Sequence, residues 1–248
     1  MQHQSHIRKK LLILQHVYRA TSPRNTRNSD NVSETHRIDL IGTVGKTSGA
    51  VLRGVAEMER DDAGKSFMID GQLNLMQRCV TYDGRHEFVT QKGTAGPNVF
   101  VDCVGFNSNT SAGPHHRYSV GTLFDNVKSE KPMESRFRGN SGTGHGWAGT
   151  QTCFYNCVAP GFNVEAPPGG ISWVIGSGNS DEKGTRVSPS SLYYQQVRER
   201  LGKAALDRLV TEQQLKHMGK YLWVAELLKN EKEQNSPTRR DKTTHLTE

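Results

Sequence analysis

The sequence predicts an all-β fold, a right-handed parallel β-helix that runs from residue 50 to about residue 178. A strand-length block of seven residues recurs along the chain, and its copies begin 24, 24, 23 and 31 residues apart. This spacing fits one coil of a solenoid. The composition agrees, because 25 glycines and only 33% hydrophobic residues suit short strands joined by tight turns.

The repeat is clearest in the blocks Asn74–Val80 and Asn98–Val104, which align without gaps. Equivalent side chains of stacked parallel strands lie about 4.8 Å apart and form ladders. The third column of the alignment is large and apolar: Leu52, Met76, Phe100, Leu123 and Phe154. The fifth is polar and should face outward or close a turn: Arg78, Asp102, Asp125 and Asn156. The sixth is compact: Val55, Cys79, Cys103, Asn126 and Cys157. We expect buried thiols in this column, with a Cys79–Cys103 disulfide as an alternative.

The chain changes character on both sides of the repeat. Residues 1–37 are basic and polar, and we expect poor order there, followed by the β-helix over 38–187. Ser188 followed by Pro189 has the pattern of a helix N-terminus. A helical extension is therefore predicted over 188–229, with a second amphipathic helix from about 203, and both helices should cover or flank the end of the solenoid. We expect the charged tail 230–248 to be disordered.

The net charge and the hydropathy of the chain limit the classes of partner that we expect it to bind. The formal net charge is +7, which suits either nucleic acid or an acidic substrate. Much of the excess lies in the first 27 residues and near Arg239 and Arg240, so we expect an acidic polysaccharide and no nucleic acid. No run of ~18 apolar residues is present, so no membrane partner is expected. The apolar stretch Leu11–Leu14 is too short for a signal peptide. We expect a monomer.

Three turn segments carry more functional groups than a turn requires. They contain Arg85 and His86, then the run from His115 to Tyr118, then His145 and Trp147. Counted back from the sixth column, Lys92, His115 and His145 lie 11, 11 and 12 residues away, so we expect them on one face of successive coils. The candidate catalytic residues are His115, His116, Arg117 and His145. The candidate substrate-binding residues are Arg85, His86, Lys92, Tyr118 and Trp147. The four cysteines lack metal-ligand spacing, and no metal-binding residue is predicted.

Several of these stretches together resemble a group of bacterial pectate-lyase-like proteins. The matching stretches are Gly84–Thr90, Gly96–Cys103, Gly113–Gly121 and Gly139–Gly149. The resemblance covers about residues 84–210. It implies a right-handed parallel β-helix, an extracellular or periplasmic location, and action on acidic polysaccharides by β-elimination, in many members with calcium.

β-Elimination at a uronate requires neutralisation of the carboxylate, removal of the C5 proton and protonation of the departing oxygen. Arg117 suits the first step, because its planar guanidinium binds carboxylates and stays charged. His116 or His145 suits the second, because imidazole titrates near neutral pH. Tyr118 or the remaining histidine suits the third.

Other functions and cofactors remain open at this point. Calcium is an alternative cofactor, with Asp102 and Asp125 as the nearest carboxylates, and no other cofactor is expected. A non-catalytic carbohydrate-binding or structural solenoid would use the same basic surface. An inverting glycoside hydrolase would need two carboxylates, for which Glu87, Asp102 and Asp125 are the candidates.

Overall fold

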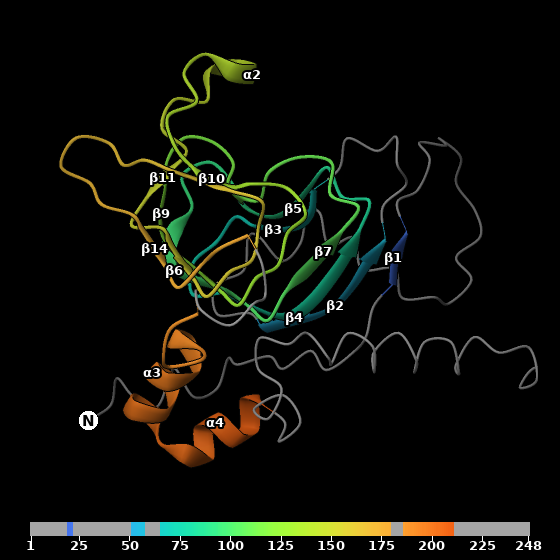
Figure 1. The fold of residues 1–248 in the computed structure, drawn as a ribbon, viewed down its shortest axis with the longest axis vertical. Helices are drawn as coiled ribbons and strands as arrows, with labels where there is room; N and C mark the ends of the chain where they lie inside the picture. The colour runs from blue at the N-terminus through green and yellow to red at the C-terminus, as the bar shows by residue number, and fades with distance from the viewer. Residues whose placement is uncertain (1–18, 22–50, 58–64, 180–185, 211–248) are drawn as a thin grey trace, which may run out of the picture.

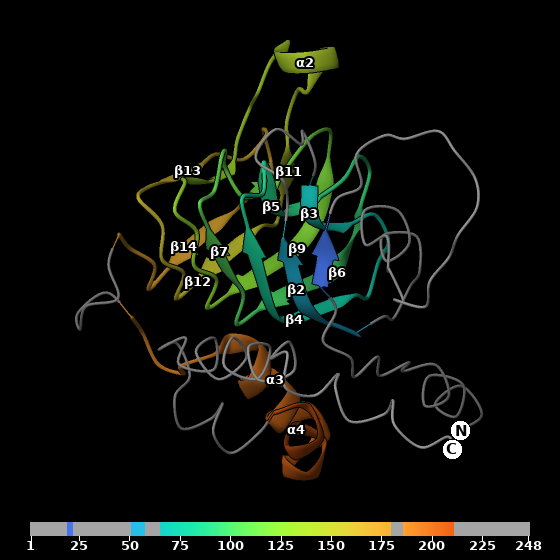
Figure 2. The same cartoon turned by 90° about the vertical axis from the view of Figure 1, so that its right-hand side faces the viewer.

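The protein is a parallel β-solenoid, seen here in a computed structural model that describes residues 19–21, 51–57, 65–179 and 186–210 (Figures 1 and 2). The fold class predicted from the repeat is confirmed. The largest sheet, sheet A, has the order β1-β2-β4-β6-β9-β12-β14, with β7 pairing to β4 and β11 to β9. Its strands are β1 (Arg19–Thr21), β2 (Val51–Glu57), β4 (Leu75–Tyr82), β6 (Ala95–Val101), β7 (Val104–Phe106), β9 (Ser119–Asp125), β11 (Gly149–Thr150), β12 (Cys153–Tyr155) and β14 (Trp173–Ile175).

Two smaller parallel sheets form the facing wall. One joins β3 (Lys65–Ile69), β5 (His86–Thr90) and β8 (Gly113–Pro114), and the other joins β10 (Met133–Ser135) to β13 (Phe162–Val164). A parallel bridge between Ala112 and Met133 links the two. The apolar side chains of both walls, Phe67 and Phe88 among them, meet in one buried core.

The predicted apolar ladder exists, but one of its members was assigned wrongly. Sheet A pairs Met76 with Phe100, Phe100 with Phe124, and Phe124 with Phe154. The rings of Phe100 and Phe124 stack 5.0 Å apart, as do those of Phe124 and Phe154. Leu123, which the alignment placed in this column, is half-buried and points to the other face. Successive side chains of a strand alternate between faces, so a shift of one residue reverses the whole block.

The same shift corrects the polar columns. We predicted Asn126 in the compact column, but it belongs to the polar column, between Asp102 and Asn156. These turn residues have φ between 51° and 55°. Asp102 N donates to Asp125 O, and Asn126 N donates to Tyr155 O. Asn and Asp tolerate this left-handed conformation better than most residues. The compact column therefore contains buried Val127 between Cys103 and Cys157. Cys79, Cys103 and Cys157 are buried thiols, and the alternative Cys79–Cys103 disulfide is not formed.

Two short helices lie along the outer face of sheet A. They are α3 (Leu192–Leu201) and α4 (Lys203–Leu209), joined at Gly202, which ends α3. Ser191, not Ser188, caps α3, because its hydroxyl accepts the Tyr194 N–H. On α3, Val197 is buried, whereas Leu201 is 70% exposed.

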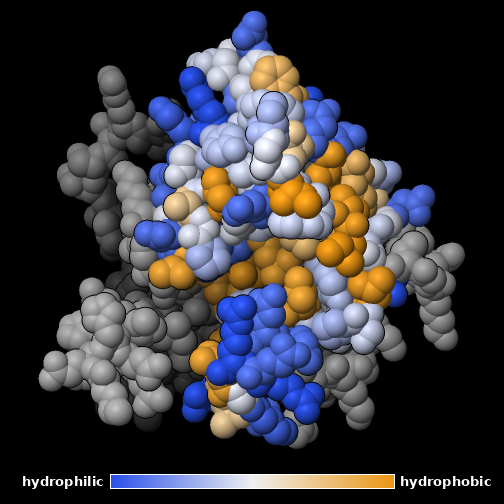
Figure 3. Space-filling model, turned by 90° about the vertical axis from the view of Figure 1, so that its left-hand side faces the viewer, coloured by the Kyte–Doolittle hydropathy of each residue, from blue (hydrophilic) through white to orange (hydrophobic). Residues whose placement is uncertain are grey.

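The helices pack on Leu75 and Val101 of sheet A, so they cover a side of the solenoid and not its end, where we had expected them (Figure 1). Neither of these helices is long and apolar enough to cross a bilayer. At the end of the solenoid, β14 leaves Trp173, Val174 and Ile175 exposed, and hydrophobic residues gather on that face above the helix pair (Figure 3).

The predicted terminal segments fall mostly outside the described residues. The expectations for 1–18, 22–37 and 230–248 lie there, as does the part of the predicted second helix after residue 210. Within the N-terminal segment, Arg19–Thr21 form β1, which pairs in parallel with β2.

Three buried carboxylates hold the structure together and are not open to substrate. Asp125 accepts hydrogen bonds from Ser191 Oγ and Tyr193 N, and Asp102 accepts one from Tyr194 Oη. Glu87 accepts hydrogen bonds from Ser108 Oγ and Ser129 Oγ. Burial raises the pKa of Glu87 from 4.5 to about 8, although both serines lower it. Burial likewise raises the pKa of Asp125 from 3.8 to about 7, against the hydrogen bonds from Ser191 and Tyr193.

The register of the ladder predicts that truncating two neighbouring residues lowers the free energy of unfolding by different amounts. Phe124→Ala should lower the free energy of unfolding by about 3–5 kcal/mol, because it opens a cavity in a stacked column. Leu123→Ala should cost only about 1 kcal/mol, because Leu123 is half-buried on the outer face. Urea denaturation of both variants measures this. A larger loss for Leu123→Ala would contradict the register.

The pKa of Glu87 predicts a pH-dependent stability. The protonated carboxyl contributes stability that is fully present below pH 4.5 and lost as the pH rises through 8. Glu87→Gln should remove most of the decline between pH 7 and 8, where Asp125, with a pKa of about 7, is already at least half ionised and contributes less. Urea midpoints for both proteins across this range measure the difference. An identical decline in the variant would show that Glu87 is not the group responsible.

Candidate functional site

Three successive coils bring the segments that contain Lys92, His115 and His145 side by side. Gly93 N donates to Arg117 O at 3.0 Å, and Arg117 N donates to His145 O at 3.2 Å. His115 N donates to Thr90 O at 3.0 Å, where β5 ends. The segment that begins with Lys92, the segment of His115 to Arg117 and the segment of His145 are thus stacked in the order expected from their distances to the ladder.

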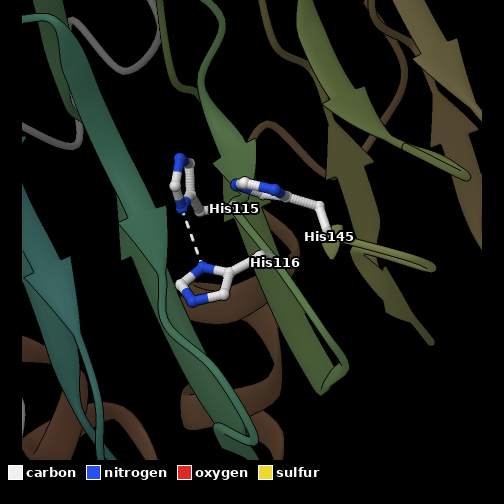
Figure 4. A group of neighbouring side chains, drawn as sticks. All are labelled: His115, His116 and His145. Atoms are coloured by element: carbon white, nitrogen blue, oxygen red, sulfur yellow. Dashed lines mark hydrogen bonds between the residues drawn. The ribbon is translucent and has the colours of Figure 1, made fainter. Parts of the chain in front are cut away.

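Three imidazoles meet at this stack (Figure 4). Nδ1 of His115 lies 2.8 Å from Nδ1 of His116. The His145 ring, which comes from the next coil, lies 5.1 Å from the His115 ring and 5.2 Å from the His116 ring. All three side chains are half-buried, and each offers a nitrogen within 4.8 Å of the others. The structure therefore groups three of the four predicted catalytic residues around one point.

An enlarged turn delivers His145 to this point. The step from Phe124 to Phe154 in the ladder is six residues longer than the two steps before it. Arg138 N donates to Gly146 O at 2.7 Å, and Ala148 N donates to Arg136 O at 3.0 Å, so the extra residues form a paired loop. Its tip carries the single turn α2 (Ser141–Gly144) and projects away from α3 and α4 (Figures 1 and 2).

Local backbone geometry fixes the orientation of the His145 ring. Gly142 has a φ of 56°, and a Cβ there would lie 2.1 Å from Cε1 of His145, so only glycine leaves room for the imidazole. Nδ1 of His145 also contacts the carbonyl oxygen of Ser141. A carbonyl can only accept, so Nδ1 carries the proton and Nε2 presents its lone pair.

A fourth histidine, His86, contacts the cluster from the buried side of His115. Its ring meets that of His115 edge to face, with centroids 4.6 Å apart, and only 4% of the residue is exposed. Nδ1 of His86 donates to Ser111 O at 2.7 Å. We predicted His86 as a substrate-binding residue, and that role stays a prediction; the structure shows a buried ring that contacts His115.

Arginine side chains surround the imidazoles. Arg117 is exposed, and its Nη2 donates to Thr143 O at 3.0 Å, which ties it to the loop of His145. Arg138 donates through Nη1 to His115 O. Partial burial lowers the pKa of Arg138, the Glu134 carboxylate opposes this, and the neighbouring Arg136 and Arg85 add to it. Arg138 was not predicted from the sequence, because the enlarged turn interrupts the residue count from the ladder.

The other predicted substrate-binding residues lie on accessible surface. Arg85 and Lys92 are exposed, and Tyr118 is 43% exposed. Trp147 packs against Phe137, with ring centroids 5.1 Å apart, at the base of the enlarged turn. Phe137 is 49% exposed, so this pair presents an aromatic surface that sequence reasoning had only half identified. The roles of Arg85, Lys92, Tyr118 and Trp147 stay predictions.

The carboxylates proposed for calcium or for hydrolysis are engaged elsewhere. Asp102 and Asp125 bond to α3 and to the segment before it, and Glu87 is fully buried. Among the described residues, the group of candidate metal ligands is made of histidines alone. The chemistry available here is therefore that of imidazole and guanidinium groups.

Comparison with known proteins identifies no relative. No protein-family model, no curated protein and no solved structure matches this chain.

Proposed function

We propose that this protein binds an acidic polysaccharide across its histidine-rich turns and cleaves it by β-elimination. The observation that carries the proposal is the meeting of His115, His116 and His145 from two coils, with Arg117 between them in the backbone ladder. Imidazoles that exchange protons near neutral pH and a guanidinium that binds carboxylates are the groups that this reaction requires. The proposal includes an extracellular or periplasmic location, where such polymers occur.

The tautomer of His145 and the exposure of the side chains support the roles that we assign to them. Nε2 of His145 has a lone pair and lies on a half-buried ring, so we assign to it the removal of the C5 proton. Arg117 is exposed beside it and neutralises the uronate carboxylate, which acidifies that proton. Tyr118 follows Arg117 directly and is 43% exposed, so its hydroxyl is our candidate to protonate the departing oxygen.

The aromatic surface of Phe137 and Trp147 favours a sugar ligand but not a reaction. Exposed aromatic faces stack on sugar rings whether or not the chain is cut. A binding solenoid without catalysis is therefore the second candidate, and it differs from the first only in turnover. A hydrolase has no comparable support, because Glu87, Asp102 and Asp125 are each held by structural hydrogen bonds.

Turnover of a panel of polyuronates distinguishes the two candidates. β-Elimination leaves a double bond conjugated to the carboxylate, and the ultraviolet absorbance of that product should rise with time. His145→Ala should abolish the rise while leaving oligosaccharide binding nearly intact. Binding with no unsaturated product from any polyuronate would support the binding solenoid and overturn the lyase.

A charge-matched pair of variants tests the role of Arg117. Arg117→Ala should weaken binding of an acidic oligosaccharide by roughly three- to tenfold, with a smaller effect at high salt, because the guanidinium is exposed. Arg208→Ala removes an exposed guanidinium from α4, on the other side of the solenoid from the loop of His145 (Figure 1), and should change nothing. Equal losses in both variants would indicate attraction by net charge and no specific site.

A further inference from the structure

We propose that His115, His116 and His145 bind one divalent transition-metal ion, of which zinc is the representative. Their ligand nitrogens lie within 4.8 Å of one another. Nitrogens on a tetrahedral zinc ion lie ~3.3 Å apart, given Zn–N bonds of about 2.0–2.1 Å. Small side-chain rotations would therefore bring the three imidazoles to a common ion.

The contact between His115 and His116 shows where the ion fits. Their Nδ1 atoms are 2.8 Å apart, so one must donate a proton that the other accepts. A dication placed between them would bind both Nδ1 lone pairs once the ring that carries the Nδ1 proton has taken its Nε2–H tautomer, so both imidazoles stay neutral and no proton is lost. The pair has to open by only about half an ångström to reach the spacing of zinc ligands.

His145 is already prepared as a ligand. Its Nδ1 proton is given to the Ser141 carbonyl, which leaves the Nε2 lone pair available. Metal-binding histidines commonly donate their second ring nitrogen to a backbone carbonyl in this way. Gly142 leaves space for the ring in this orientation.

The donor set selects the ion. Imidazole suits zinc, copper, nickel and cobalt, whereas calcium and magnesium require oxygen ligands. Among the described residues, the group of side chains close enough to hold an ion contains no cysteine. Burial also raises the pKa of Cys153 to about 11, which keeps that thiol protonated near neutral pH. Three protein ligands leave a fourth position for water or for an oxygen of a bound molecule, as in catalytic zinc sites.

The surrounding arginines set the charge of that fourth ligand. Three neutral imidazoles do not offset the charge of a dication. Arg117 and Arg138 add two more positive charges nearby, which the one Glu134 carboxylate beside Arg138 offsets only in part. Both guanidiniums donate to backbone carbonyls of the site, Thr143 O and His115 O. The balance of charge therefore favours an anion at the open position, such as hydroxide or a carboxylate. An ion at Nε2 of His145 occupies the lone pair that we assigned to proton removal, so the two uses exclude one another.

Calorimetric titration of the full chain with zinc chloride, without sugar, tests the proposal. We expect one saturable site whose affinity for zinc falls as the pH is lowered from about 7.5 to about 5.5, because protons compete with zinc for the imidazole nitrogens. His116→Ala and His145→Ala should each weaken it by roughly a hundredfold. His217→Ala, a change to a histidine far along the sequence, should leave it unchanged. Circular dichroism checks the fold, and the Gln variants replace any Ala variant that unfolds.

Several outcomes would overturn the site. They are the absence of a saturable zinc site, zinc binding that survives His116→Ala with His145→Ala, or calcium binding with the same dependence on these residues. The titration needs no substrate, so its result is independent of the lyase assay. Zinc binding without turnover would leave the metal site standing, and turnover without zinc binding would remove it.

Discussion

The stacking of equivalent side chains inside the solenoid is the constraint on which the rest of the structure depends. Phe100, Phe124 and Phe154 stack ring on ring, with centroids 5.0 Å apart, so each coil takes its register from the one before. Parallel pairing carries that register into the turns. A histidine at a given distance from the ladder therefore arrives beside the same point on the next coil, and a site can form from residues far apart in the sequence.

The candidate site depends on a departure from the regular repeat. The coil before Phe154 is six residues longer than the two before it, and the extra residues form the loop that returns His145 to His115 and His116. Turn residues with left-handed backbones serve the other side of the molecule. Asn126 and Asn156 donate to Ser190 O and Val187 O, which fastens the segment leading to α3. The regular coils thus form the solenoid, while the inserted loop positions His145 and the left-handed turn residues hold the segment that leads to α3.

The repeat made the fold predictable, because identical spacing and matching columns leave few alternatives to stacked coils. The predicted register of one coil was wrong by one residue. Leu123 and Phe124 are both large and apolar, so the ungapped alignment did not distinguish which of them belongs in the apolar column. The approximate grouping of Lys92, His115 and His145 followed from counting along coils. The burial of His86, the contribution of Arg138 and the pairing of Phe137 with Trp147 depend on how the enlarged turn folds back, which no periodicity describes.

The central claim is that the three histidines form one site that receives an acidic sugar. Nitrogen-15 NMR of the imidazoles, during titration with a short polyuronate, tests it most directly. We expect the resonances of His115, His116 and His145 to shift together with one dissociation constant, and a neutral oligosaccharide of equal length to leave them in place. Polyuronate binding that leaves these three resonances unchanged would contradict the account.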